Sequence, residues 1–377
     1  MSFLYPKEYT IAPCLNGSDE CFADNCSWNN SFDDPRIEIL KRYSYGIALP
    51  AIGLLGVIGN ILNLVVLTRK NMRGTAYIYM RGYSAAALLA ILFAVPFAWR
   101  VLVHEEFGNW DNLILAFYHT HLELFLGNGC LGVGVLMLIA LTLERYVSVC
   151  HPGYARPCLG PPKRVVCLIS MATFIVYLPA VFRSQIVPCR IESTGETLYR
   201  RQDVNDMVNH KLFKAYTIAI ELIFKVIPII LLAVLNARIL LVYRKSCEKR
   251  RKMTLYRTTS GEEDPRKFAE ERRLVLLLGS TSILFLVCIS PMVILNVTLS
   301  ENNLQSYAYQ VFRALANLLE ITNYSITFYI YCLFSEDFRN TLFRTFSCSD
   351  EAPNRRTAKL SHPTNTPTTT ITHVRNA

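Results

Sequence analysis

The sequence has little charge, and five long runs contain no Asp, Glu, Lys or Arg. Charged residues make up 18% of the 377 residues. The uncharged runs are residues 43–68, 82–99, 124–143, 165–182 and 274–300. Each approaches the roughly 20 residues that a helix needs to cross about 30 Å of hydrocarbon. These runs exclude a chain of soluble domains.

Two further apolar segments, residues 215–241 and 314–334, carry the charged side chains Glu221, Lys225 and Glu320. With the five uncharged runs they make seven crossings. In lipid each backbone polar group must be satisfied within its own segment, so the crossings should be helices. The expected fold class is an all-α membrane protein, a seven-transmembrane helix bundle with a short amphipathic eighth helix.

The expected division of the chain follows from these segments. Residues 1–42 form an extracellular, glycosylated N-terminal arm, and residues 43–334 form the bundle. Residues 335–348 form the amphipathic helix, and residues 349–377, rich in Ser, Thr, Pro and Asn, form a disordered cytoplasmic tail. No apolar signal-peptide core opens the sequence, so we expect the first helix to act as an uncleaved signal anchor.

Basic residues gather in three connections between the crossings. They are Arg69, Lys70, Arg73, Arg156, Lys163, Arg164, Arg244, Lys245, Lys249, Arg250, Arg251 and Lys252. The positive-inside rule places these connections in the cytoplasm. We therefore expect a multi-pass protein of the plasma membrane with its N-terminus extracellular. The formal net charge of +10 then faces lipid headgroups and cytosolic partners, and no nucleic acid is expected as a ligand.

The expected outer segments carry signals for covalent modification. N-glycosylation motifs in the arm begin at Asn16, Asn25 and Asn29. Four of the 12 cysteines fall outside, and they allow two disulfides in three connectivities: Cys14, Cys21, Cys26 and Cys189. On the inner side, Cys348 follows the amphipathic stretch and is a candidate for palmitoylation, with a free thiol as the alternative.

An arginine and two carboxylates lie where two apolar stretches meet the expected cytoplasmic side. Glu144, Arg145 and Tyr146 follow one stretch, and Glu271 precedes another. Charges at the edge of the hydrocarbon are costly unless they pair, so we interpret the group as a polar latch between two helices. The alternative is that Glu144 alone holds Arg145 and that Glu271 is solvated.

The expected outer halves of the helices carry many polar side chains. The set is Arg100, His119, His121, Glu123, Arg183, Glu221, Lys225, Arg313 and Glu320. Ionisable groups inside a membrane normally face a bundle interior or a wet cavity. The set therefore favours a polar, charged ligand, and a peptide fits best.

Some members of this set have a structural alternative. Glu221 and Lys225 are one helical turn apart and can neutralise each other. Arg183 and Arg313 can pair with carboxylates of the loops. Glu123 and Glu320 have no obvious neighbour in sequence and would suit the arginine of a short amidated peptide. The candidate ligand site comprises Glu123, His121, Glu221, Lys225, Glu320, Arg100 and Arg313.

Several motifs occur together along most of the chain. They are Gly59-Asn60, Glu144-Arg145-Tyr146 with Val149-Cys150-His151-Pro152, Pro228, Cys288-Ile289-Ser290-Pro291, Tyr331 and Phe338-Arg339. In this combination the chain resembles a rhodopsin-like (class A) G protein-coupled receptor. Within that class, the strings at residues 59–63, 121–124 and 144–152 look like those of invertebrate FMRFamide-type neuropeptide receptors.

The resemblance implies how the latch works. In such receptors the arginine matching Arg145 contacts the carboxylate matching Glu271 at rest, and a heterotrimeric G protein when active. Pro228 and Pro291 would kink their helices so that the inner ends can swing. A ligand then needs only to favour the open bundle. Phosphorylation of the tail would recruit arrestin, with candidates Ser361, Thr364, Thr366, Thr368, Thr369 and Thr370.

The chain departs from the pattern of this class at several positions. The replacements are Ala87 for a sodium-binding aspartate, Ile289 for a tryptophan, Thr327-Phe328 for Asn-Pro and Asn236 for a tyrosine. We therefore expect no sodium site. Thr120 stands where a cysteine normally caps the third helix, so Cys189 lacks its customary partner, and we expect it to join the arm.

Other classes fit less well. No lysine lies in residues 314–334, which excludes a retinal pigment, and no internal repeat indicates a transporter. No paired catalytic aspartates or nucleophile with its base lie deep in the apolar runs, so we expect no enzyme, cofactor or metal site. The main alternative is a decoupled receptor that scavenges a peptide or acts through arrestin only.

Overall fold

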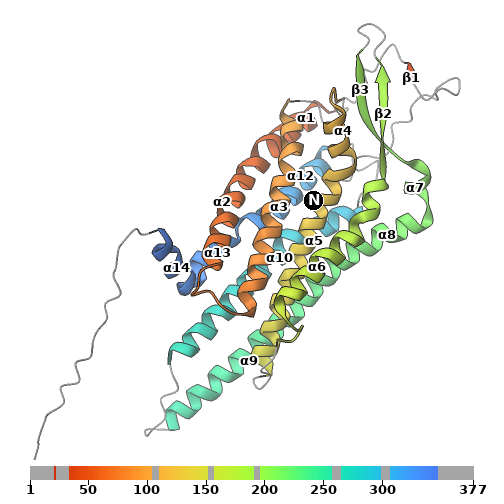
Figure 1. Cartoon of the computed structure of the whole chain (residues 1–377). Helices are drawn as coiled ribbons and strands as arrows, with labels where there is room; N and C mark the ends of the chain where they lie inside the picture. Colours follow the sequence, from red (N-terminus) through yellow and green to blue (C-terminus); the bar gives the residue numbers. More distant parts are fainter. Residues whose placement is uncertain are drawn as a thin grey trace, which may run out of the picture.

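The computed structural model describes residues 21–22, 34–103, 110–151, 157–190, 196–256, 265–298 and 306–346. Long helices form one bundle, with a β-hairpin at one end and the short helix α14 (Glu336–Phe346) at the other (Figure 1). These are termed the hairpin end and the α14 end.

The bundle is built from seven helical segments, several of which change helix type along their length. In chain order they are α1 (Pro35–Lys41), η1 (Arg42–Ala48) and α2 (Leu49–Leu67); α3 (Thr75–Val103); α4 (Leu113–Phe117), η2 (Tyr118–Leu122) and α5 (Glu123–Cys150); α6 (Pro162–Tyr177) and η3 (Leu178–Phe182); α8 (Lys211–Glu221), η4 (Leu222–Val226) and α9 (Ile227–Tyr256); α10 (Pro265–Thr298); and α12 (Tyr307–Ser325) with α13 (Thr327–Phe334).

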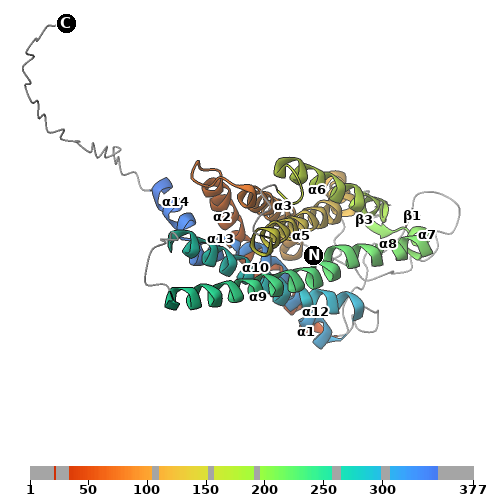
Figure 2. The ribbon, with the colours of Figure 1, turned by 90° about the horizontal axis from the view of Figure 1, so that it is seen from below.

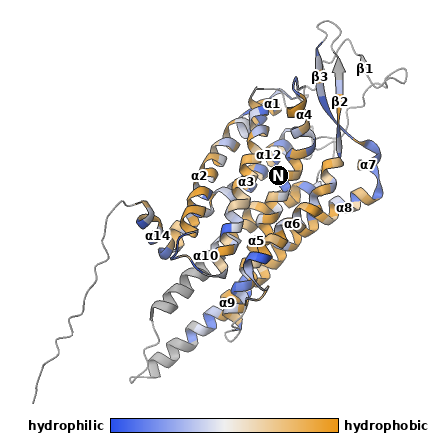
Figure 3. Ribbon diagram, in the orientation of Figure 1, coloured by the Kyte–Doolittle hydropathy of each residue, from blue (hydrophilic) through white to orange (hydrophobic). Residues whose placement is uncertain are grey.

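Six of these segments are long and apolar enough to span a membrane, judged by length and composition over the described residues. Apolar residues, orange in Figure 3, follow these helices. Large apolar side chains such as Trp99, Leu168 and Leu333 are exposed there, as expected for a lipid-facing surface. The seventh segment, α12 with α13, is less apolar because it buries several polar side chains: Gln310, Arg313, Asn317 and Glu320.

A three-stranded sheet lies at the hairpin end, and hydropathy gave no sign of it. Strand β2 (Ser184–Arg190) pairs antiparallel with β3 (Thr197–Asp203), and β1 (Cys21–Phe22) pairs parallel with β2. The short helix α7 (Asn205–Asn209) leads from β3 back to the bundle. These strands are short and lie outside the apolar runs, which explains why they were not predicted.

Helices α3 and α5 pack side by side in the middle of the bundle (Figure 2). Tyr79 of α3 and Met137 of α5 are fully buried. The rings of Tyr83 and Tyr324 stack with centroids 6.0 Å apart, and the Tyr324 hydroxyl donates to the Leu131 carbonyl at 3.4 Å. These contacts tie α3, α5 and α12 into one core.

The Gly59-Asn60 motif holds α2 against the end of α12. Asn60 Nδ2 donates to the carbonyl of Gly56 at 2.9 Å and to that of Tyr324 at 3.0 Å. A side chain on Gly59 would place its Cβ 3.0 Å from Cβ of Phe328, so Phe328 would have to shift to admit any other residue. These two hydrogen bonds of Asn60, termed the clasp, lie beside the break between α12 and α13.

Two π-helical segments each end two residues before a proline. Segment η1 ends at Ala48 before Pro50, and η4 ends at Val226 before Pro228. Proline lacks the N–H that the carbonyl four residues earlier would accept, so the preceding turn widens. Pro291, in contrast, lies inside the continuous helix α10.

The first helix begins inside the segment assigned to the arm. Asp34 caps it, accepting the backbone N–H of Arg36 at 3.0 Å, and Pro35 occupies the first helical position. Helices α9 and α10 likewise extend beyond their apolar runs, into the basic connection at the α14 end. The expected amphipathic helix corresponds to α14, which begins at Glu336 and ends at Phe346.

Candidate functional site

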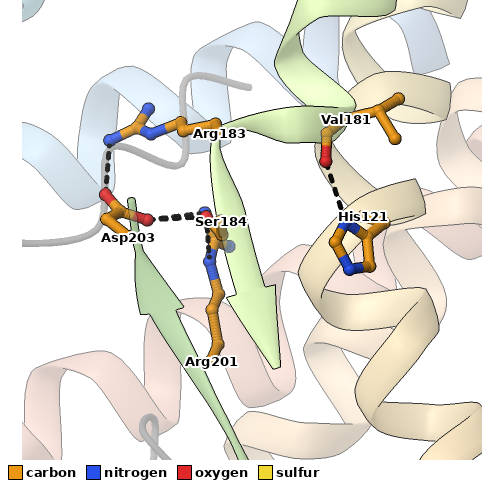
Figure 4. A network of polar contacts seen from close by, with 6 residues as sticks. All are labelled: His121, Val181, Arg183, Ser184, Arg201 and Asp203. Atoms are coloured by element: carbon orange, nitrogen blue, oxygen red, sulfur yellow. Dashed lines mark hydrogen bonds and ion pairs between the residues drawn. The ribbon is translucent and has the colours of Figure 1, made fainter. Parts of the chain in front are cut away.

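The base of the hairpin is held by a polar cluster that no sequence pattern indicated (Figure 4). Asp203 accepts from Arg183 Nη2 at 3.1 Å and from the Ser184 hydroxyl at 2.6 Å. Arg201 Nε donates to the Ser184 oxygen at 3.0 Å, and its Nη2 lies 3.6 Å from Asp203. The pairing of Arg183 with a loop carboxylate was expected, although its partner was not named.

Charge governs the protonation of this cluster. Burial raises the pKa of the Asp203 carboxyl, but Arg183 and Arg201 and the Ser184 hydroxyl outweigh burial and hold that pKa below its ordinary value. Asp203 therefore stays ionised and keeps both guanidinium groups in place at neutral pH.

His121 fixes the top of the third segment to the fourth. Its Nδ1 donates to the Val181 carbonyl at 2.8 Å, and its ring lies 5.0 Å from that of Phe117 (Figure 4). His121 was predicted to contact a ligand, and the structure gives it this structural partner through one of its two nitrogens.

Trp110 links the hairpin to the bundle interior. Its backbone N–H donates to the Tyr199 carbonyl at 2.9 Å and its carbonyl accepts from the Tyr199 N–H at 2.8 Å. The buried indole stacks on the His119 ring, with centroids 5.3 Å apart and planes inclined by 11°. One residue thus contacts β3 through its backbone and the third segment through its side chain.

Beneath Trp110 lies a buried triad of Arg100, His119 and Glu123. Glu123 Oε1 lies 3.7 Å from Arg100 Nη2, and Oε2 lies 2.7 Å from His119 Nδ1. All three side chains are at least 96% buried, since 4% is the largest exposed fraction among them. Because an ionised carboxylate only accepts, the short contact requires a hydrogen on His119 Nδ1.

Glu123 and Glu320, predicted to bind the same ligand group, line one cavity. Its remaining polar lining comes from Asn128 and Tyr324, and apolar walls come from α3 and α5. The cavity measures about 10 Å³, room for a single water. A larger ligand group would therefore need side chains around it to move.

Two other predicted ligand residues form a pair of their own. Lys225 Nζ lies 2.9 Å from Glu221 Oε2, and Asn296 Nδ2 donates to the same carboxylate oxygen at 2.6 Å. This is the mutual neutralisation weighed from their spacing, with a third partner from α10. Arg313 is buried in α12 and its carbonyl accepts from Asn317.

At the α14 end, the residues of the latch lie at the end of α5. Glu144 Oε1 accepts the Leu159 backbone N–H at 3.3 Å, and the Tyr146 ring lies 5.8 Å from that of His151. Among residues whose side chains the structure describes, no carboxylate lies within ion-pairing distance of Arg145. Glu144 thus makes no direct ion pair with Arg145, and the choice between the latch and the alternative in which Glu144 alone holds Arg145 stays open.

Tyr331 lies in the core above this end. It is 3% exposed, its ring meets that of Phe338 edge-on at 5.6 Å, and it lines a cavity of about 20 Å³. The other polar residues of that lining are Tyr83, Thr281, Asn323 and Thr327.

Several predicted sites lie outside what the structure describes. These are the glycosylation sites Asn16, Asn25 and Asn29, the cysteines Cys14 and Cys26, and the palmitoylation site Cys348. Glu271 lies in α10, but its side chain is not described, so its pairing with Arg145 stays a prediction.

Comparison with known proteins gives the family. Residues 59–326 match the 7 transmembrane receptor (rhodopsin family). The chain is 31% identical to a probable G-protein coupled receptor of Caenorhabditis elegans over 322 residues, 85% of this chain and 73% of the relative. It is 25% identical to the sex peptide receptor of Drosophila melanogaster (85% and 75% covered) and 24% identical to the FMRFamide receptor of that species (85% and 56%). The chain belongs to the rhodopsin family of seven-transmembrane receptors, a family of receptors and not of enzymes.

Proposed function

We propose that this receptor binds a peptide at the hairpin end and signals to a heterotrimeric G protein at the α14 end. The basic residues of the connections at the α14 end support a cytoplasmic location for that end. The hairpin end and the N-terminus are then extracellular. Relatives named for a sex peptide and for FMRFamide support a peptide as the ligand.

The cavity between Glu123 and Glu320 carries the proposal. Two carboxylates from different helices line one buried space below the hairpin. Arg100 and His119 already compensate Glu123. We assign the ligand's cationic group to this cavity, with Glu320 as its proposed contact. A guanidinium suits such a site because it can form two parallel hydrogen bonds to a carboxylate.

Replacement of Glu320 tests this assignment. A library of short amidated peptides, screened by calcium and cyclic AMP responses in cells, first identifies an agonist. Glu320→Gln should then reduce its potency by about 10- to 100-fold, because a hydrogen bond to a charged group contributes about 1.5–3 kcal/mol. Glu38→Gln is the matched control, since Glu38 is an exposed carboxylate at the same end of the bundle.

Surface expression of both variants is measured alongside potency. Equal potency of Glu320→Gln and wild type at equal expression would remove Glu320 from the site. Coupling is tested separately, by nucleotide release from a purified G protein with peptide present. A decoupled receptor would bind the peptide without accelerating that release.

A further inference from the structure

The register of the sheet brings two cysteines of the chain together. In the parallel pair of β1 with β2, Cys21 is the partner of Cys189, and Phe22 is the partner of Arg190. Neighbouring strands lie about 4.8 Å apart, and partner residues lie on the same face of a sheet. A disulfide needs Cα atoms about 4.4–6.8 Å apart, so this backbone placement meets the requirement.

We propose that Cys21 and Cys189 form a disulfide that fixes the N-terminal arm to the hairpin. The proposal rests on the extracellular placement of the hairpin end made above, because disulfides persist in oxidising compartments. The four outer cysteines allow three pairings, and this bond selects one of them. The two cysteines that remain, Cys14 and Cys26, would then pair with each other if a second disulfide forms.

The bond forms by oxidation of two thiols. Each sulfur loses its proton, one S–S bond is made, and two electrons pass to the disulfide of a thiol oxidase in the secretory pathway, which becomes a dithiol. The described cysteines not in strands lie in the helices or near the α14 end: Cys130, Cys150, Cys158, Cys167, Cys247, Cys288 and Cys332. They are therefore poor competitors for Cys189.

The disulfide also takes the place of the bond that a cysteine at position 120 would form with Cys189. Thr120 is buried in η2, below the hairpin, and offers no thiol to Cys189. The hairpin is held instead by the Trp110–Tyr199 backbone bridge on the β3 edge and by β1 on the β2 edge.

Cleavage of the arm in intact cells tests the bond. The full chain receives an epitope before Met1 and a specific protease site between Phe32 and Asp33. We expect the epitope to stay on the receptor after cleavage and to be lost when a reductant is added. In Cys21→Ser and Cys189→Ser, cleavage alone should release the epitope. Cys14→Ser and Cys26→Ser are matched controls and should retain it until reduction.

The outcomes separate this proposal from the orientation on which it rests. An epitope that antibody cannot reach on intact cells overturns the extracellular placement, and the disulfide with it. An accessible epitope that cleavage releases without reductant overturns the disulfide alone. Mass spectrometry of the unreduced wild type does not depend on any variant folding: a linked Cys21–Cys189 peptide supports the bond, and Cys189 linked elsewhere or alkylated overturns it.

Discussion

His119 and Glu123 form a 2.7 Å contact one helical turn apart, across the π-helical segment η2. Arg100 approaches the other carboxylate oxygen from α3 at 3.7 Å. Glu123 was predicted as a contact for a peptide cation, but it has two internal partners. Its first role in the structure is to compensate a buried arginine and to join two segments of the bundle.

Glu123→Gln should destabilise the receptor. It removes the carboxylate that lies 3.7 Å from the buried Arg100, and removal of one partner of a buried pair costs about 3–5 kcal/mol. Thermal unfolding of the purified protein measures the loss. Arg100→Gln should be similarly harmful, and the double variant should lose less than the sum of the two. Additive losses would show that the two side chains do not interact.

Trp110→Ala should destabilise the receptor far more than Trp99→Ala. Trp110 is buried against His119, whereas the Trp99 side chain is 65% exposed on the lipid-facing surface. Removal of a buried tryptophan costs about 3–5 kcal/mol. Thermal unfolding compares the two variants, and agonist potency reports whether the hairpin has shifted. Equal losses would refute a special role for Trp110.

The contribution of Asp203 should depend on pH. Its pKa is lowered in the fold, so its stabilisation is complete above the ordinary value of 3.8 and is lost as the pH falls through the lowered pKa. The difference in melting temperature between wild type and Asp203→Asn should therefore be constant from neutral pH to mild acid. It should shrink only below that value. Asp206→Asn, at an exposed position of α7, is the control and should show no difference.

Asn60→Leu should lower stability by about 1–3 kcal/mol, because it leaves the Tyr324 carbonyl without its donor. Asn236→Leu is a matched comparison, since among the residues that the structure describes Asn236 Nδ2 donates within its own helix alone, to Leu232 at 2.6 Å. Chemical or thermal unfolding ranks the two. A larger effect at Asn236 would contradict the clasp between α2 and α12.

Glu271→Gln should raise ligand-independent signalling if the proposed latch restrains the resting receptor. The neutral amide attracts Arg145 less than the carboxylate does, so the open bundle is favoured. Basal nucleotide exchange on the G protein is the readout, with Glu270→Gln as the neighbouring control. Unchanged basal activity at equal expression argues against the latch.

Much of the bundle could be predicted from the sequence because lipid imposes simple demands on length and polarity. The uncharged runs 82–99, 124–143 and 165–182 lie within helical segments of the bundle, and segments ending at Leu67 and Thr298 cover nearly all of the runs 43–68 and 274–300. Helix boundaries were less accessible: Asp34 and Pro35 start the first helix within polar sequence, where hydropathy has no signal. The strands were missed because they are short and lie outside the apolar runs, and because the partner of β1 comes from a distant part of the chain.

The polar residues in the outer halves of the helices could be identified from the sequence because ionisable groups are costly in a membrane. Most of their interaction partners could not be predicted. Glu221 with Lys225 could be paired from spacing alone, and His119 with Glu123 has the same spacing. Arg100 with Glu123 joins different helices, and no periodicity in either helix indicates that they meet. The role of Trp110 could not be predicted from the sequence, because it depends on contacts with both Tyr199 and His119.

The wide turn before Pro228 accommodates a residue that has no N–H to donate. In η4 the Ile227 N–H donates to the Leu222 carbonyl, five residues earlier, where a regular helix would use the carbonyl four residues earlier. The same spacing joins the Leu49 N–H to the Ser44 carbonyl ahead of Pro50 in the first segment. Each proline is therefore met by a local widening of the helix, and the segment continues across the bundle instead of ending there.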